Sequence, residues 1–135
     1  MAEQHADDGS VIGRLSRYMV EARTAPLPAE VTRKVKHHIL DTLAAMVSGA
    51  HLPPGRLAIE YARRRGGTPE AQVVGSPLVT DAGHAAMANG FMAHADETDD
   101  SHAASGTHPG CAVVPAALAM AERGDRSGQR FLNAV

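Results

Sequence analysis

Apolar residues recur at intervals of three and four along most of this chain, which is the spacing of one face of an α-helix. The first such segment covers residues 11–22, and Ser10 is expected to be its N-cap. The second covers about residues 31–48, with Gly49 expected as the residue just past its end. Roughly twenty residues at a rise of about 1.5 Å predict a rod of about 30 Å, long enough to pack against several neighbours.

The middle of the chain is expected to hold two further helices with an extended segment between them. A shorter helix covers about residues 53–65, with a proline pair at its start and a glycine pair after its end. Residues 70–77 (EAQVVGSP) are too few for a helix and are expected to be extended. The next helix, over about 81–95, is capped by Thr80 or Asp81, and its small residues indicate that another backbone passes close by.

Two more helices are expected towards the end of the sequence, which makes the fold class all-α with a bundle-like arrangement. One covers about residues 110–123, and Ser127 caps the other. Phe131, Leu132 and Val135 in that last helix are expected to have no remaining sequence to pack on. The chain is therefore expected to be a fragment of a longer protein.

Composition and charge narrow the class of protein. An apolar content of 44% and a charged content of 21% are typical of globular domains. With a net charge of −2 and no basic patch, neither nucleic acid nor a membrane is an expected partner. One cysteine, Cys111, and a polar start without a signal-type segment favour the cytoplasm. Residues 1–9 are expected to be disordered, and residues 10–135 to form the domain.

One segment concentrates the groups that move protons near neutral pH. Residues 94–110 (HADETDDSHAASGTHPG), here called the acidic loop, interleave three histidines with four carboxylates and contain no lysine or arginine. A histidine ordered by a carboxylate is the usual device for general acid–base catalysis. His108 also directly precedes a predicted helix, whose positive N-terminal end attracts anions. The loop is therefore predicted to be a proton-transfer site without a metal.

Two other interpretations of the loop stay open. Its carboxylates could be solvated or cap helices, with the histidines incidental. Histidine and aspartate at this density could also bind zinc, iron or manganese, although no motif such as H-E-x-x-H is present. Outside the loop's carboxylates and histidines, His37 and His38 are interpreted as a surface pair and Cys111 as a buried, inert thiol.

Three stretches of the sequence resemble the N-terminal helical domain of the MmgE/PrpD family, which includes 2-methylcitrate dehydratases and cis-aconitate decarboxylases. They are HHILDTLAAMVSGA, MANGFMAHADETDDSH and THPGCAVVPAALAMAERG, and the resemblance covers about residues 10–135. It implies a two-domain lyase with an α+β lid domain beyond this chain and an active site between the domains. It also implies a homodimer that needs no metal and no organic cofactor.

The resemblance also assigns roles to individual residues of the acidic loop. Catalytic roles fall on Glu97, Asp99, His102 and His108, and substrate-binding roles fall on Asp100, Ser101 and Thr107. Many members have aspartate where Glu97 stands and threonine where Ser101 stands. The longer acid shifts its carboxylate by about one C–C bond, a displacement that matters for proton transfer.

The expected activity is dehydration of a small polycarboxylate, in which a proton next to a carboxylate is removed and water is expelled. The alternatives are a decarboxylase or epimerase of the same family, a metal-dependent hydrolase, and a truncated helical module kept only for dimerisation. Because the loop supplies no cation to bind a polycarboxylate, the 135 residues alone are expected to be inactive or nearly so.

Overall fold

The computed structural model describes residues 9–135, so all of the predicted disordered segment except Gly9 lies outside the described residues. Six helices and one short β-hairpin make up the described part, which confirms the all-α class. In chain order the elements are α1 (Val11–Ala22), α2 (Ala29–Gly49), α3 (Pro53–Arg65), β1 (Ala71–Gln72), β2 (Val79–Thr80), α4 (Ala82–Ala93), α5 (Gly110–Arg123) and α6 (Gly128–Ala134).

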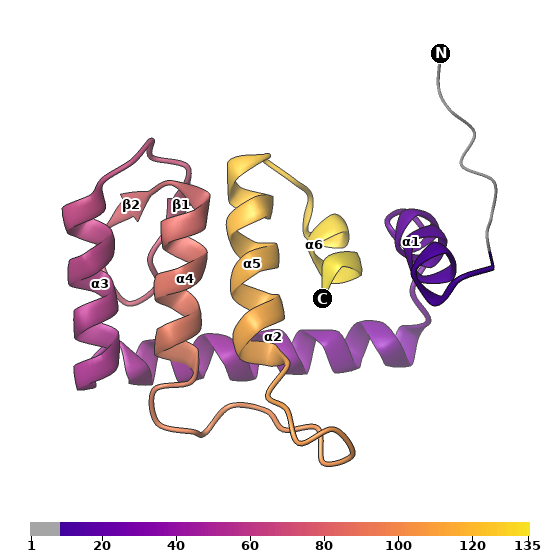
Figure 1. Ribbon diagram of the computed structural model, residues 1–135, viewed down its shortest axis with the longest axis horizontal. Helices are drawn as coiled ribbons and strands as arrows, with labels where there is room; N and C mark the ends of the chain where they lie inside the picture. Colours follow the sequence, from indigo (N-terminus) through magenta and orange to yellow (C-terminus); the bar gives the residue numbers. More distant parts are fainter. Residues whose placement is uncertain (1–8) are drawn as a thin grey trace.

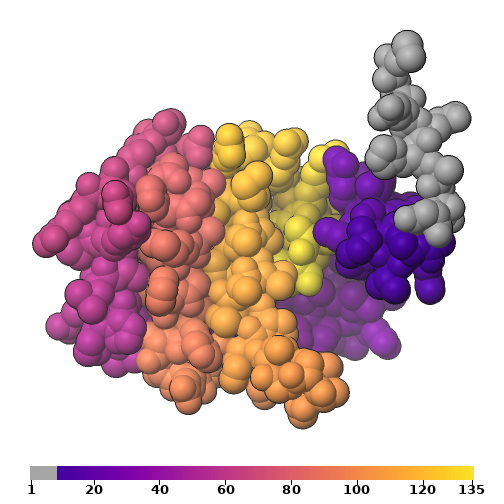
Figure 2. All heavy atoms as spheres, viewed as in Figure 1, coloured from indigo at the N-terminus to yellow at the C-terminus, as the bar shows by residue number. Residues whose placement is uncertain are grey.

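Helices α3, α4 and α5 stand side by side, and the long helix α2 runs across them (Figure 1). Helix α4 is central, because it packs against α2, α3 and α5. Seen as spheres, the three helices form adjacent ridges on one face of the molecule (Figure 2). The long helix α2 packs against α4, α5 and α6, which confirms the prediction that it contacts several neighbours.

Close approach of backbones replaces large side chains in this core. Most of the buried apolar residues are alanines, and Met46, Met92, Val73 and Val114 are the largest apolar side chains buried completely. The predicted close approach at α4 is confirmed, since a Cβ on Gly90 would lie 3.1 Å from the carbonyl oxygen of Cys111 on α5. Small residues thus set the spacing between α4 and its neighbours.

Gly49 corrects one sequence-based expectation. It was predicted to lie just past the end of α2, but α2 includes it, and Ala50 is the C-cap in a right-handed conformation. A Cβ on Gly49 would overlap the carbonyl oxygen of Met92 on α4. Glycine stands here because α4 crosses α2 in contact with its backbone, and no left-handed turn is involved.

The extended segment predicted over 70–77 is confirmed in part as a short antiparallel hairpin, a pairing that the sequence did not predict. Ala71 pairs with Thr80, and Gln72 pairs with Val79. Asn89 of α4 holds this hairpin, because its side chain accepts a hydrogen bond from the Val74 N–H (2.9 Å) and donates one to the Gln72 carbonyl (3.0 Å).

The predicted N-caps are confirmed. The hydroxyl oxygens of Ser10 and Ser127 accept hydrogen bonds from helix N–H groups, at 3.0 and 3.4 Å. Asp81, one of two residues proposed for the start of α4, accepts from the N–H groups of Gly83 and His84, each at 3.1 Å. Helix α4 ends at Ala93, slightly earlier than expected.

The end of the chain corrects a second expectation. Phe131 and Val135 were predicted to have nothing to pack on, but both pack against the core, because α6 folds back beside α5. The Asn133 side chain also donates hydrogen bonds to the carbonyls of Ala22 and Ala25, at 2.9 and 2.8 Å. Within residues 9–135, no helix has both the length and the apolarity to cross a bilayer.

Candidate functional site

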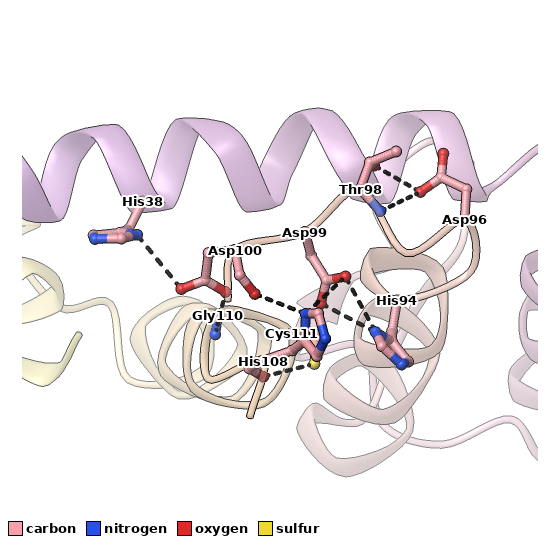
Figure 3. A network of polar contacts seen from close by, with 9 residues as sticks. All are labelled: His38, His94, Asp96, Thr98, Asp99, Asp100, His108, Gly110 and Cys111. Carbon is pink, nitrogen blue, oxygen red and sulfur yellow. Dashed lines mark hydrogen bonds and ion pairs between the residues drawn. The ribbon is translucent and has the colours of Figure 1, made fainter. Parts of the chain in front are cut away.

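The acidic loop connects α4 to α5, and a buried carboxylate lies at its centre (Figure 3). The Asp99 side chain is fully buried, and His94, the C-cap of α4, faces it. Nδ1 of His94 lies 3.1 and 3.2 Å from the two carboxylate oxygens of Asp99. The pairing satisfies a carboxylate that would be costly to bury alone.

His108 approaches the same carboxylate from the other end of the loop. Its Nδ1 lies 2.8 Å from the Asp100 carbonyl oxygen and 3.6 Å from Oδ1 of Asp99, and its ring centroid is 5.0 Å from that of His94. A carbonyl oxygen only accepts hydrogen bonds, so Nδ1 of His108 carries the proton. Nε2 is then the ring atom that can exchange a proton with a ligand.

Asp100 fastens the loop to the two helices beside it. Its Oδ1 accepts a hydrogen bond from the Gly110 N–H (2.8 Å), at the start of α5, and its Oδ2 lies 3.5 Å from Nδ1 of His38 on α2. The Gly110 site is tight, because a Cβ there would lie 2.8 Å from the Thr42 hydroxyl oxygen. The carboxylate of Asp100 thus occupies the first free N–H of α5.

Cys111 lies beside this cluster in the first turn of α5. Its thiol donates to the His108 carbonyl oxygen at 3.1 Å, and its side chain is half-buried, less than the buried position expected from the sequence. The pKa of the Cys111 thiol is raised, mainly by burial and to a smaller extent by the nearby Asp99 carboxylate. The thiol therefore stays protonated near neutral pH, which suits the expectation of low reactivity.

The first part of the loop holds Glu97 in an unusual backbone conformation. Glu97 has a φ of 55°, a region that costs a residue with a Cβ roughly 1 kcal/mol. The turn is held by Asp96, which accepts hydrogen bonds from the hydroxyls of Thr98 (2.7 Å) and Ser48 (2.8 Å), and these bonds lower the pKa of Asp96. The Glu97 side chain is exposed.

The tip of the loop is a small exposed hairpin. The His102 N–H donates to the Thr107 carbonyl at 2.8 Å, and Nδ1 of His102 lies 2.7 Å from the Ser105 hydroxyl. That hydroxyl also lies 2.8 Å from the Thr107 hydroxyl. Ser101 is exposed just before this turn.

Of the seven residues predicted for the site, the structure brings Asp99, Asp100 and His108 together. The other four are exposed and lie outside this cluster: Glu97, Ser101, His102 and Thr107. Three further residues contact this cluster although the sequence assigned them no role in the site: His38, His94 and Cys111. His94 could have been included from the sequence, since it belongs to the histidine-rich stretch. No sequence pattern indicates His38, because only the packing of α2 against α5 brings it near Asp100.

Comparisons with known proteins find sequence similarity over nearly the whole chain. The sequence model of the MmgE/PrpD N-terminal domain matches residues 13–135. The chain is 30% identical to the cis-aconitate decarboxylase-like protein oryM of Aspergillus oryzae (strain ATCC 42149 / RIB 40), over 95% of the chain and 28% of that protein. It is 26% identical to cis-aconitate decarboxylase of Aspergillus terreus, over 90% of the chain and 26% of that protein. No solved structure gives a significant match.

Proposed function

The chain belongs to the MmgE/PrpD family, and from that premise we propose that its acidic loop forms one wall of the active site of a lyase acting on a small polycarboxylate. One observation carries the proposal: two histidines converge on the buried Asp99 carboxylate, and the His108 ring is anchored at Nδ1 with Nε2 left to exchange protons. Cis-aconitate, the substrate in the names of two fungal relatives, is a small polycarboxylate of this class.

Decarboxylation is the reaction we favour, because of those names. When CO₂ leaves, the electron pair of the broken C–C bond stays on the substrate carbon and is delocalised into the neighbouring unsaturated carboxylate. One carbon of this delocalised system then takes a proton, and protonated His108 supplies it from Nε2. Asp99 and the Asp100 carbonyl fix the orientation of the ring during the transfer.

Dehydration, the reaction first expected from the sequence, remains a proposal and uses the same groups. A base removes the proton next to a carboxylate, and the hydroxyl group departs as water after an acid protonates it. Glu97 is our candidate for the second proton-transfer group, because it is an exposed carboxylic acid in the same loop. Ser101, His102 and Thr107 are exposed as well, so a substrate can reach them and hydrogen-bond to them.

The charge of the loop limits what these residues can do alone. Four carboxylates and no lysine or arginine would repel a polycarboxylate, so cations from outside residues 94–110 must complete the pocket. The chain spans about a quarter of the length of the fungal relatives, at 28% and 26%. The activity proposed here is therefore that of the whole protein.

The test is to incubate the whole purified protein with cis-aconitate or with 2-methylcitrate, following CO₂ release and the product spectrum. His108→Gln is expected to lower kcat by roughly 10²- to 10⁴-fold, which is what general acid–base catalysis supplies. His37→Gln, an exposed change on α2, is the matched control and should leave kcat unchanged. A wild-type protein that converts neither substrate would refute the proposed activity, and an unimpaired His108→Gln variant would refute the proposed role.

A further inference from the structure

We propose that His94, Asp99 and Cys111 form a binding site for a divalent transition-metal ion, with zinc as the best fit. Each of the three residues offers one ligand atom, and these atoms all lie within 4.8 Å of one another. Zn–N and Zn–O bonds of about 2.0–2.2 Å and Zn–S bonds of about 2.3 Å imply ligand separations of roughly 3.3–3.7 Å in a tetrahedral site. His94 Nδ1 and the Asp99 oxygens already lie 3.1 and 3.2 Å apart.

The donor set selects the class of ion. Imidazole, carboxylate and thiolate together suit zinc and other late transition metals, whereas magnesium and calcium prefer oxygen ligands only. His94 is the C-cap of α4 and Cys111 lies in the first turn of α5, so two packed helices hold two of the three ligands. Three protein ligands leave the fourth position for water.

The surrounding charges also favour a cation. The Asp99 side chain is fully buried, Asp100 adds a second carboxylate, and residues 94–110 contain no lysine or arginine. Binding is balanced in protons: the Cys111 thiol releases one proton to solvent, and the His94 proton moves from Nδ1 to Nε2 so that Nδ1 can bind the ion. The thiol then exchanges its contact with the His108 carbonyl for the metal.

Such an ion would compete with proton transfer, and this consequence rests on the proposed function. Oδ1 of Asp99 faces both His94 and His108. An ion bound to the Asp99 carboxylate takes away one of the two groups that orient the His108 ring and leaves only the Asp100 carbonyl. Zinc is therefore expected to inhibit turnover, and a chelator is expected to reverse the inhibition.

The direct test is a cobalt(II) titration of the whole, untagged, metal-free protein without substrate. The expected result is one equivalent of cobalt with tetrahedral visible bands and a near-ultraviolet thiolate-to-cobalt band, all displaced by zinc. Cys111→Ala should abolish the near-ultraviolet band. Cys111→Ala and His94→Gln should each weaken binding at least about tenfold, since losing a mere hydrogen-bond partner of a ligand already costs about 10- to 100-fold.

Helix α4, which His94 caps at its C-terminal end, also offers a matched control. His84 pairs with Asp81 at the start of α4 without a nearby thiol, so His84→Gln should not change the cobalt spectrum or affinity. The proposal is overturned if the wild-type protein shows no thiolate band, or if His94→Gln, which alters a partly exposed side chain, binds cobalt as tightly as wild type. Because binding is read without substrate, a protein that binds cobalt but converts nothing refutes the proposed function alone.

Discussion

The Asp100 carboxylate connects three parts of the molecule: the acidic loop, the start of α5 and, through His38, the helix α2. Its predicted role was substrate binding, and the geometry adds a role in holding the loop. A group that accepts a hydrogen bond from a helix N-terminus contributes about 0.5–2 kcal/mol to the free energy of unfolding. Only the role in holding the loop predicts that an Asp100 variant loses stability when no substrate is present.

Asp100→Ala is expected to lower the free energy of unfolding by about 1 kcal/mol, because the Gly110 N–H loses its acceptor. Asp100→Asn keeps an oxygen at the same position and should retain most of that stability. Urea denaturation of the whole protein without ligand measures both. Equal midpoints for wild type and Asp100→Ala would show that the carboxylate does not hold the loop.

At the scale of the element, helix α4 depends on an ionised cap. The N–H and the imidazole of His84 donate to Asp81, and these hydrogen bonds hold the pKa of Asp81 below its ordinary value of 3.8. A carboxyl whose pKa is lowered by folding stabilises the fold fully above its ordinary pKa. That contribution is lost as the pH falls through the lowered value.

Asp81→Ala is therefore expected to be less stable than wild type at pH 7, and the difference should shrink as the pH falls below about 4. Asp81→Asn is the matched variant, since asparagine also caps helices but does not titrate. Thermal unfolding between pH 2 and pH 7, in roughly unit steps, measures the trend. A difference that stays constant down to the acid limit would contradict the assignment of the cap to the ionised form.

The crossing of α2 and α4 leads to a second prediction at this scale. Gly49→Ala is expected to lower the free energy of unfolding by about 1–3 kcal/mol, because the new methyl group would overlap the Met92 carbonyl and force the helices apart. Gly128→Ala is the control, since nothing lies within 4 Å of a Cβ there. Chemical denaturation compares the two, and equal stabilities would show that the helices can separate without cost.

At the scale of the whole molecule, the stabilising contacts are unevenly distributed. Helix α1 has no buried residue, and its Val11 and Ile12 side chains are 78% and 70% exposed. Helix α4 buries six residues and contacts three other helices. Regions with few buried contacts open locally at free energies well below that of global unfolding.

Hydrogen exchange is therefore expected to be fast in α1 and slowest in the centre of α4. Mass spectrometry of peptides from the two helices, measured on the whole protein at one pH and temperature, gives the comparison. Equal protection of α1 and α4 would mean that contacts outside the described arrangement cover the apolar face of α1.

The sequence by itself determined the helices and the segment in which the candidate groups lie. Helix boundaries followed from apolar periodicity and from caps such as Ser10 and Ser127, because these signals depend only on residues one or two turns apart. The acidic loop was evident for the same reason, since its histidines and carboxylates are concentrated in one continuous segment. Local information therefore sufficed for the all-α class and for the candidate region.

Only the tertiary structure decided which of those groups meet. Gly49 was expected to end α2 and instead accommodates α4, because a close crossing between distant segments leaves no local pattern. Likewise, the burial of Asp99 and its convergence with His94, His108 and Cys111 require α4 and α5 to lie side by side. Contacts between different helices depend on how the helices pack. The apolar periodicity of one helix shows which of its faces is buried, but it does not show which helix packs there or which residues meet.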